Sequence, residues 1–491
     1  MLRAHHGIGL CTLALLTLGL VMVNSAGMGV SDSTPTNPAE TLRSVLHSRP
    51  AIYAMLALAV LAVVWAMPMR SLLAGAAEWR WGGRHDNGYD QAGDEGDAGT
   101  SPITLLVLAT LVLVSLAALV YIPGLSREVN GSKRWLMLNL PGLGPTSAQP
   151  SEFVKWLTVP VLAWFCVAQQ SRMGSLVKGG GPAMLALGLI AAVIAKEDLG
   201  TGVLIAAAGG CVLLAGGLRL WQAALSIPVG AGGVALAVWD EPYRFERLQT
   251  FLNPYADPQD AGYHMIQSMA AIAGGGGPGR GLGNGLQKFG YLPEDQTDFL
   301  FAIICEELGI AGAFLVCGLL AACLVGVLRV AWKERNPLAQ LIALGVGVML
   351  GLQALINLFV VTGLAPTKGI PLPLVSSGGT GWILTAASLG VVMSLGRTQP
   401  IELEPAEIED AEIDDAEADR EEADHEWDEG EWEEGEWEED EYEQADDEGD
   451  DDDAEYEADY EDEWDDAEDE AEDESDADPD ADGTLFERTG R

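Results

Sequence analysis

The sequence predicts an all-α, polytopic membrane protein with about ten transmembrane helices, one long external loop and a disordered acidic C-terminal tail. One observation is a series of ten apolar runs within residues 1–400, most of them close to the ~20 residues with which a helix crosses a bilayer. The other is charge. Residues 401–491 contain 51 Asp or Glu and three Arg, so they carry the whole net charge of −48, whereas residues 1–400 contain 23 acids and 23 bases.

The ten predicted spans follow one another along residues 1–400, which we expect to form one domain. They cover residues 8–28, 51–69, 103–122, 152–170, 182–196, 199–217, 221–239, 299–328, 338–363 and 380–396. Only Lys196, Glu197 and Asp198 separate the fifth span from the sixth, so these charges are expected to cap a tight hairpin at a membrane face. We expect the first run to be retained as a span, although a signal peptide is the alternative.

Lysine and arginine are unequally distributed between the short loops on the two sides. With ten spans both termini share one side, whose short loops hold eleven cations against six on the opposite side. The positive-inside rule then places the N- and C-termini in the cytoplasm. Residues 240–298 become the long external loop, which exceeds the length of a mere connector.

The sequence excludes several kinds of site. Residues 1–400 contain no basic patch dense enough for nucleic acid. The run GGGGPGRGLGNG (274–285) lacks the lysine of a phosphate-binding loop, and is expected to be either mobile backbone near a binding site or a flexible linker. The six cysteines lie in apolar stretches without the spacing of a zinc site or a disulfide framework, so we expect small buried hydrophobes.

The tail at 401–491 contains the pentad repeat EWDEG EWEEG EWEED EYEQA. Such a field of like charges buries too little apolar surface to offset the entropy lost on ordering, so we expect the tail to be disordered. Its Trp427, Trp432 and Trp437 either anchor a basic partner or belong to a simple low-complexity repeat.

Two short segments bring ionisable residues to the ends of predicted spans, where charge is costly. In QPSEFVKW, Glu152 and Lys155 share one helical face, either as a structural pair near the helix dipole or as a pair facing an external polar cavity. In NGSKRWLML, Lys133, Arg134 and Trp135 either anchor the interface or help to hold an anion such as a diphosphate.

The third such segment is LPEDQTDFLFAIICEELG (292–309). Asp295 is expected to cap the eighth helix, with Asp298 in its first turn. Glu306 and Glu307 lie roughly 12 to 14 Å further along that helix at 1.5 Å per residue, so they must face protein or water. We expect them to complete a buried network with Glu152, Lys155 or loop cations; a direct role on substrate is the alternative.

Together these stretches resemble the SEDS family (shape, elongation, division and sporulation), which includes FtsW, RodA and SpoVE. The matching stretches occur in family order and are TLGLVMVNSAG (17–27), NGSKRWL (130–136), QPSEFVK (149–155), EDLGTG (197–202), FLNPYADPQDAGYHMIQS (251–268), GRGLGNGLQKFGYLPEDQTDFLFAIICEELGIAG (279–312) and APTKGIPLPLVSSGG (365–379). The QKFGYLPE and NPYADP stretches are slightly more similar to FtsW than to RodA.

The resemblance implies a peptidoglycan glycosyltransferase of the inner (cytoplasmic) membrane, active in cell division or elongation. It would polymerise lipid II, the undecaprenyl-diphosphate-linked disaccharide pentapeptide, beside a class B penicillin-binding transpeptidase. The resemblance implies that Asp298 is the catalytic residue and that Trp135, Glu152 and Lys155 line or support the outer cavity.

The residues support an inverting mechanism, because a single carboxylate can serve as the base of one displacement. The cations that hold the diphosphate must come from a pool formed by Lys133, Arg134, Lys155, Arg244, Arg247, Arg280 and Lys288. A divalent cation, Mg²⁺ or Mn²⁺, could bridge Asp298 and the diphosphate oxygens.

The chain departs from the family pattern in four places, one of which is YHMIQ (263–267) where a YQ motif is usual. It has SSGGTG where SYGGSS is usual, Lys196 and Glu197 where glutamine and proline are favoured, and Lys368 where threonine is usual. Two other classes of function remain open. One is a lipid II flippase or ion-coupled transporter, and the other is a catalytically silent membrane scaffold of the divisome whose tail recruits partners.

Overall fold

The computed structural model describes residues 4–27, 45–78, 101–129, 132–140, 144–260 and 262–397. The acidic tail predicted for residues 401–491 lies outside the described residues, so its disorder and its boundary stay predictions.

Helices dominate the described chain, and one helix coincides with each predicted span. They are α1 (Ala4–Ala26), α3 (Arg49–Ala66), α5 (Pro102–Ala118, continued by the 3₁₀ turn η1, Leu119–Tyr121), α6 (Pro150–Ala168), α7 (Gly180–Glu197), α8 (Leu199–Ala215), α9 (Leu220–Asp240), α12 (Leu300–Lys333), α13 (Pro337–Val361) and α14 (Thr380–Arg397). Within the described residues, eight helices are long and apolar enough to cross a membrane, and α8 is an apolar helix of 17 residues. The predicted helical, polytopic fold is confirmed.

Short polar side chains cap several of these helices. Ser48 accepts a hydrogen bond from the N–H of Ala51 at the start of α3, and Asn336 does the same for the first turn of α13. The predicted hairpin between α7 and α8 is a single residue, Asp198, whose carboxylate accepts from the N–H and the hydroxyl of Thr201. Asp198 therefore ends one helix and begins the next.

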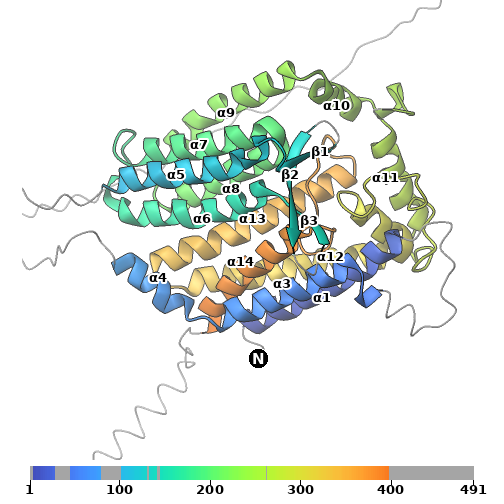
Figure 1. Cartoon of the computed structure of the whole chain (residues 1–491), viewed down its shortest axis with the longest axis horizontal. Coiled ribbons are helices and arrows are strands. Elements are labelled where there is room, and N and C mark those ends of the chain that lie inside the picture. The colour runs from blue at the N-terminus through green and yellow to red at the C-terminus, as the bar shows by residue number, and fades with distance from the viewer. Residues whose placement is uncertain are drawn as a thin grey trace, which may run out of the picture. The chain divides into compact units, whose positions relative to one another are not determined.

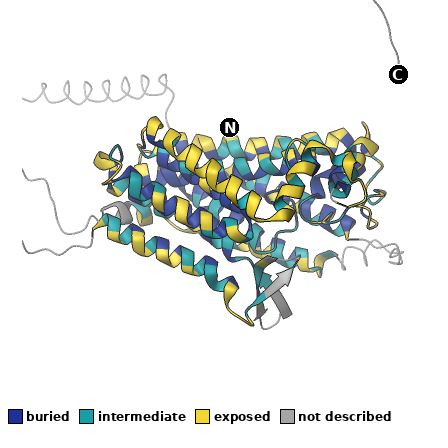
Figure 2. Ribbon diagram, turned by 90° about the horizontal axis from the view of Figure 1, so that it is seen from above, coloured by how far each residue is buried: buried dark blue, intermediate teal, exposed yellow. Residues whose placement is uncertain are grey.

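The helices build two apolar clusters, which α13 joins. One cluster is centred on α1, α3, α12 and α14, the other on α5, α6, α7 and α8, and α13 packs against helices of both. Figure 1 shows these two groups side by side, in blue and orange for the first and in cyan and green for the second. Buried residues face the interior of the bundle, while the outer helix faces are exposed (Figure 2), as expected where lipid covers them.

Helix α9 differs from the other long helices, because it is exposed on nearly all sides. It contacts α7, α8 and α10, and its large apolar side chains, such as Ile227 and Trp239, are exposed. Figure 1 shows α9 at the edge of the α5–α8 group, with α10 continuing from its end.

Several elements were not predicted from the periodicity of the sequence. A three-stranded antiparallel sheet, in the order β1 (Ser126–Val129), β2 (Ser132–Leu140) and β3 (Gly144–Ala148), connects α5 to α6. A short helix, α4 (Met69–Glu78), follows α3. The long loop 240–298 contains α10 (Pro242–Leu252), the 3₁₀ turn η3 (Pro254–Ala256) and α11 (Tyr263–Gly275).

The start of α12 differs from its prediction. The helix begins at Leu300 with Phe299 as its N-cap residue, no side chain caps it, and its first turn contains no acid. Residues 293–298 instead form turns in which the N–H groups of Thr297 and Phe299 donate to the carbonyl of Glu294, both at 3.2 Å. The predicted cap by Asp295 is therefore wrong, and Asp298 precedes the helix.

Helix α12 is interrupted at Gly309, where φ is 64° and ψ is −156°. The glycine-rich loop meets the helix at this break. The N–H groups of Arg280 and Gly281 donate to the carbonyls of Glu306 and Glu307, both at 2.9 Å. A Cβ on Gly309 would lie 2.4 Å from the backbone nitrogen of Gly279, so this close approach and the positive φ both require glycine.

Candidate active site

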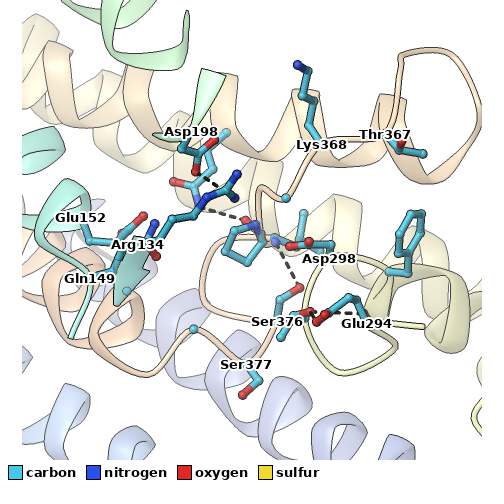
Figure 3. Close-up of a pocket in the computed structure, with 18 of the residues that line it drawn as sticks. Arg134, Gln149, Glu152, Asp198, Glu294, Asp298, Thr367, Lys368, Ser376 and Ser377 are labelled. Atoms are coloured by element: carbon cyan, nitrogen blue, oxygen red, sulfur yellow. Dashed lines mark hydrogen bonds and ion pairs between the residues drawn. The ribbon is translucent and has the colours of Figure 1, made fainter. Parts of the chain in front are cut away.

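A cavity of about 890 Å³ lies where the ends of several helices meet the sheet and the long loops. Its walls come from β2, α6, the α7–α8 turn, α10, residues 293–299, the loop 367–378 and the start of α14 (Figure 3). Carboxylates, cations, amides and hydroxyls line it together: Arg134, Trp135, Gln149, Glu152, Asp198, Tyr243, Glu246, Arg247, Asp260, His264, Glu294, Thr297, Asp298, Gln353, Lys368, Ser376 and Ser377. Such a mixture suits a polar, charged ligand.

Asp298 is held in the cavity wall by its backbone. The side-chain amide of Asn357 in α13 donates to the carbonyl of Asp298 and to that of Ile370, both at 2.8 Å, and so joins the turn before α12 to the loop 367–378. Within the described residues the Asp298 carboxylate itself has no hydrogen-bond or ion-pair partner. The side chain is therefore available to a ligand.

Burial, together with the negative charges of Glu294 and Asp198, raises the pKa of Asp298 to about 7. The positive charges of Arg134 and Arg247 act in the opposite direction without reversing the shift. A carboxyl group with a pKa near 7 is partly deprotonated at neutral pH and is a stronger base than an ordinary aspartate, so Asp298 has the properties of a general base.

Arg134 points from β2 into the cavity and toward the α7–α8 turn (Figure 3). Its Nε donates to the carbonyl of Glu197 at 3.0 Å, and its Nη1 lies 3.7 Å from Oδ2 of Asp198. Gly369 lies between the arginine and the proposed base, because a Cβ built there would be 3.6 Å from Nη1 of Arg134 and 3.2 Å from Oδ2 of Asp298. Glycine at 369 keeps this space open.

Glu152 lines the cavity from the first turn of α6, and Lys155 lies behind it. Nζ of Lys155 donates to both oxygens of Glu152, at 2.9 and 2.7 Å, and to Oε1 of Gln353 at 2.9 Å. Gln353 also donates to the carbonyl of Pro371 at 2.9 Å, in the loop 367–378. Lys155 is 1% exposed, so it supports Glu152 and the loop and does not reach a ligand.

Two further cations, Arg247 and Lys368, line the cavity. Nη1 of Arg247, in α10, donates to the carbonyl of Thr367 at 3.1 Å, and its guanidinium lies over the Tyr243 ring. Lys368 follows Thr367 and points away from Asp298 in Figure 3. Burial, together with the positive charge of Arg247, lowers the pKa of Lys368 to about 8, although the negative charge of Asp198 opposes the shift.

The structure does not bring the remaining predicted cations into the cavity. Lys133 is exposed beside the α7–α8 turn. Arg244 donates to the carbonyls of Ala195, Lys196 and Ala237, so it binds the ends of α7 and α9. Lys288 and Arg280 pair with Glu307 and Glu306. These four cations and Lys155 either bind other groups of the protein or lie outside the cavity. Their prediction as substrate ligands is therefore wrong.

Glu306 and Glu307 are 1% and 0% exposed and bind the glycine-rich loop. Glu307 accepts from Nζ of Lys288 at 2.9 Å, from the Ser25 hydroxyl at 2.8 Å and from the N–H groups of residues 283 and 285. Glu306 accepts from the N–H groups of residues 286 and 287 at 2.8 and 3.2 Å, and Nε of Arg280 lies 3.4 Å away. Apart from Ser25 in α1, these partners are loop groups, and Glu152 and Lys155 are not among them.

These contacts also hold the glycine-rich run 274–285, for which the sequence allowed either mobile backbone near a binding site or a flexible linker. Four backbone N–H groups of residues 283–287 bind the two buried carboxylates, and two more at positions 280 and 281 bind backbone carbonyls of α12. The run thus packs against α12, which contradicts the flexible linker, one of the two alternatives that the sequence left open.

Among the charged or titratable residues of the cavity that sequence reasoning missed are Asp198, Glu294, Lys368 and His264. Asp198 was predicted only as a hairpin cap, and Lys368 only as a departure from a family pattern. A signal was available, because all four lie on the same side of the predicted spans as Asp298. Their convergence depends on how α8, α11 and the loop 367–378 pack, which periodicity does not specify.

Comparison with known proteins decides the family. The sequence model of the FtsW/RodA/SpoVE family, described as "Cell cycle protein", matches residues 102–400, more than half of the chain. The chain belongs to this family. Every described residue that lines the cavity falls inside the matched region. The family resemblance seen in the sequence is confirmed, and with the apolar helices it identifies a multi-pass membrane protein.

Relatives of this FtsW/RodA/SpoVE protein include the probable peptidoglycan glycosyltransferase FtsW of Coxiella burnetii (strain RSA 493 / Nine Mile phase I). That protein is 34% identical over 390 residues, which cover 79% of this chain and 94% of the relative. Stage V sporulation protein E of Bacillus subtilis (strain 168) is 37% identical over 296 residues, covering 60% of this chain and 78% of the relative.

A solved structure shows the same fold. It is a chain of a peptidoglycan synthase complex, in a study of the structural coordination of polymerization and crosslinking. It aligns with a TM-score of 0.57 at 24% identity and covers 81% of this chain and 98% of that chain.

Proposed function

We propose that the chain is a peptidoglycan glycosyltransferase that polymerises lipid II into glycan strands at the outer face of the inner membrane. One observation carries the proposal: the Asp298 carboxylate, which has no partner among the described residues, faces a cavity whose other walls present Arg134, Arg247 and Lys368. Joining two sugars needs a base for the acceptor hydroxyl and positive charge for the leaving diphosphate. The name of the FtsW relative, a probable peptidoglycan glycosyltransferase, supports the same activity.

In the proposed reaction Asp298 accepts the proton of the acceptor hydroxyl while that oxygen attacks the anomeric carbon of the donor. The new glycosidic C–O bond forms as the C–O bond to the diphosphate breaks, and the diphosphate leaves with the electron pair. One base and one displacement invert the anomeric centre; a retaining path would need a second carboxylate about 5 Å from the first, acting as a nucleophile.

The two arginines would hold the diphosphate. A guanidinium can donate two parallel hydrogen bonds to phosphate oxygens, and Arg134 and Arg247 both line the cavity. Backbone carbonyls orient both of them, that of Glu197 for Arg134 and that of Thr367 for Arg247. Lys368 would add a third positive charge further from Asp298.

Purified protein in lipid vesicles with labelled lipid II tests this function. Glycan polymer formed by the parent and lost in Asp298→Asn supports the glycosyltransferase. Movement of lipid II across the bilayer without polymer would instead support the flippase, and neither activity would support the scaffold.

We expect kcat/KM for polymerisation to be bell-shaped in pH. Since the base must be deprotonated, a pKa of about 7 at Asp298 makes the rate fall as pH drops below about 7. Since Lys368 binds as a cation, a pKa of about 8 makes the rate fall as pH rises above about 8. Initial rates between about pH 5 and 10 measure both limbs.

Two variants separate the limbs of this profile. Lys368→Arg stays charged, so it should remove the upper limb and keep the lower one. Glu294→Gln removes a charge that raises the Asp298 pKa, so it should move the lower limb to lower pH. A lower limb near the ordinary aspartate pKa of about 4 would contradict the assignment of Asp298.

We propose that the Asp298 carboxylate has a second role, as a ligand of a divalent cation, Mg²⁺ or Mn²⁺. The described residues contain no group of three or more His, Cys, Asp or Glu side chains that could hold a metal ion. Mg²⁺ bound together with substrate phosphates needs only one or two carboxylates, and the unpaired Asp298 fits that requirement. When bound, the ion would neutralise charge on the diphosphate oxygens.

Chelation distinguishes the two roles of Asp298. If a cation is held there, we expect EDTA to reduce polymerisation by about tenfold or more and added Mg²⁺ or Mn²⁺ to restore it. Undiminished polymerisation in EDTA would leave Asp298 with the base role alone.

The proposal extends to topology and partners. Both termini would lie in the cytoplasm, since the cavity then opens on the outer side where glycan is built. A class B penicillin-binding transpeptidase would cross-link the product, in line with the synthase complex that shares the fold. The acidic tail could bind a basic partner, which stays a prediction from the sequence.

A further inference from the structure

Glu197 occupies a position that disfavours an acid. It is the last residue of α7, where the partial negative charge of the helix dipole repels a carboxylate. The residue is also outside the cavity lining, so the proposed chemistry does not use it. An acid at this place needs another reason.

The contacts of Glu197 supply one. Its Oε1 accepts from the hydroxyl of Tyr121 at 2.8 Å, and its Oε2 accepts from the N–H of Lys133 at 3.1 Å. Tyr121 ends the 3₁₀ turn after α5, and Lys133 lies near the start of β2. One carboxylate therefore ties the end of α5 and the start of the central strand β2 to the end of α7.

The residue after Lys133 is Arg134, and the same turn holds it. Nε of Arg134 donates to the Glu197 carbonyl at 3.0 Å, a group that the helix end leaves without a helical partner. Nη1 lies 3.7 Å from Asp198 (Figure 3). Since the side chain of Glu197 fixes the backbone of β2 one residue before Arg134, the tether determines where the guanidinium enters the cavity.

We propose that Glu197 is a positioning residue, which with Tyr121 holds strand β2 so that Arg134 faces the diphosphate of the substrate. The inference rests on the proposed function for the identity of that ligand. The tether depends on the carboxylate, because both bonds are accepted by the side-chain oxygens of Glu197.

The test measures binding of undecaprenyl diphosphate to the full-length protein in detergent, together with lipid II polymerisation. Glu197→Ala and Tyr121→Phe should each weaken binding, Glu197→Ala by about three- to tenfold, because Arg134 is no longer held in place. Glu197→Gln should recover part of the affinity, since its amide oxygen can still accept one of the two hydrogen bonds. Glu241→Gln is the matched control, an exposed acid at the start of α10 whose side chain makes no capping bond.

A double variant shows whether Glu197 acts through the arginine. If it does, adding Glu197→Ala to Arg134→Ala should weaken binding no further, whereas two independent effects would multiply. Multiplying effects, or parental affinity in both Glu197→Ala and Tyr121→Phe, would overturn the proposal. If the parental protein binds undecaprenyl diphosphate but makes no polymer, only the proposed glycosyltransferase function is overturned. If it neither binds undecaprenyl diphosphate nor makes polymer, the positioning role of Glu197 is overturned as well.

Discussion

Asp298→Asn is expected to abolish lipid II polymerisation, with a loss of about 10²- to 10⁴-fold or more. Asparagine has nearly the same shape but cannot accept the proton of the acceptor hydroxyl. The backbone contact that holds position 298, from Asn357, is unaffected by the change. The variant should therefore insert and fold like the parent, and the rate of polymer formation from labelled lipid II measures the loss.

Asp295→Asn is the control for this prediction. Asp295 lies three residues earlier in the same turn region but does not line the cavity. We expect its substitution to change the rate by less than about twofold, since surface and loop changes away from a site have small effects. A folded Asp298→Asn protein with more than about a tenth of the parental rate would remove Asp298 from the role of base.

Lys288→Met is expected to cause the largest loss of stability, about 3 to 5 kcal/mol. The side chains of Lys288 and Glu307 are both 0% exposed, and Nζ lies 2.9 Å from Oε1. Removing the lysine leaves a buried carboxylate with only neutral donors, the Ser25 hydroxyl and two N–H groups. Unfolding of the purified protein in detergent, followed by heat or denaturant, measures the change.

The loop cation Arg280 provides the matched comparison. Its side chain is 37% exposed, and its Nε lies 3.4 Å from Glu306, so Arg280→Ala should cost less than about 1 kcal/mol. The double variant Lys288→Met with Glu307→Gln should recover part of the loss, because no buried charge is then unpaired. Equal losses in Lys288→Met and Arg280→Ala would contradict the view that burial of the pair stabilises the loop.

The membrane architecture followed from composition because a bilayer restricts the choices. A span must be a helix of about 20 apolar residues, since lipid offers no partner for backbone polar groups. Each of the ten predicted spans therefore matches a helix. This holds even for α7 and α8, which a single residue, Asp198, separates. Periodicity did not predict the small sheet, because its strands lie in a loop segment where no bilayer imposes a length.

The candidate site was predicted in part. Asp298, Arg134, Trp135, Glu152 and Arg247 were selected from sequence and line the cavity. The prediction of Lys288 as a substrate ligand was wrong, because a lysine in a glycine-rich loop is expected to be exposed. In the structure the loop packs against α12, and Lys288 pairs with Glu307. The prediction also failed for Arg244, whose guanidinium is used to bind helix ends.

The sequence by itself determined the helical membrane body, its family and the carboxylate proposed as base, because hydropathy and motifs are local properties of the chain. Only the tertiary structure decided which charges share one cavity. Arg134, Asp198, Asp298 and Lys368 come from four separate segments, and each lies in a turn, strand or loop whose place depends on the packing of helices beside it. The raised pKa of Asp298 has the same origin, because burial and neighbouring charges exist only in the folded chain.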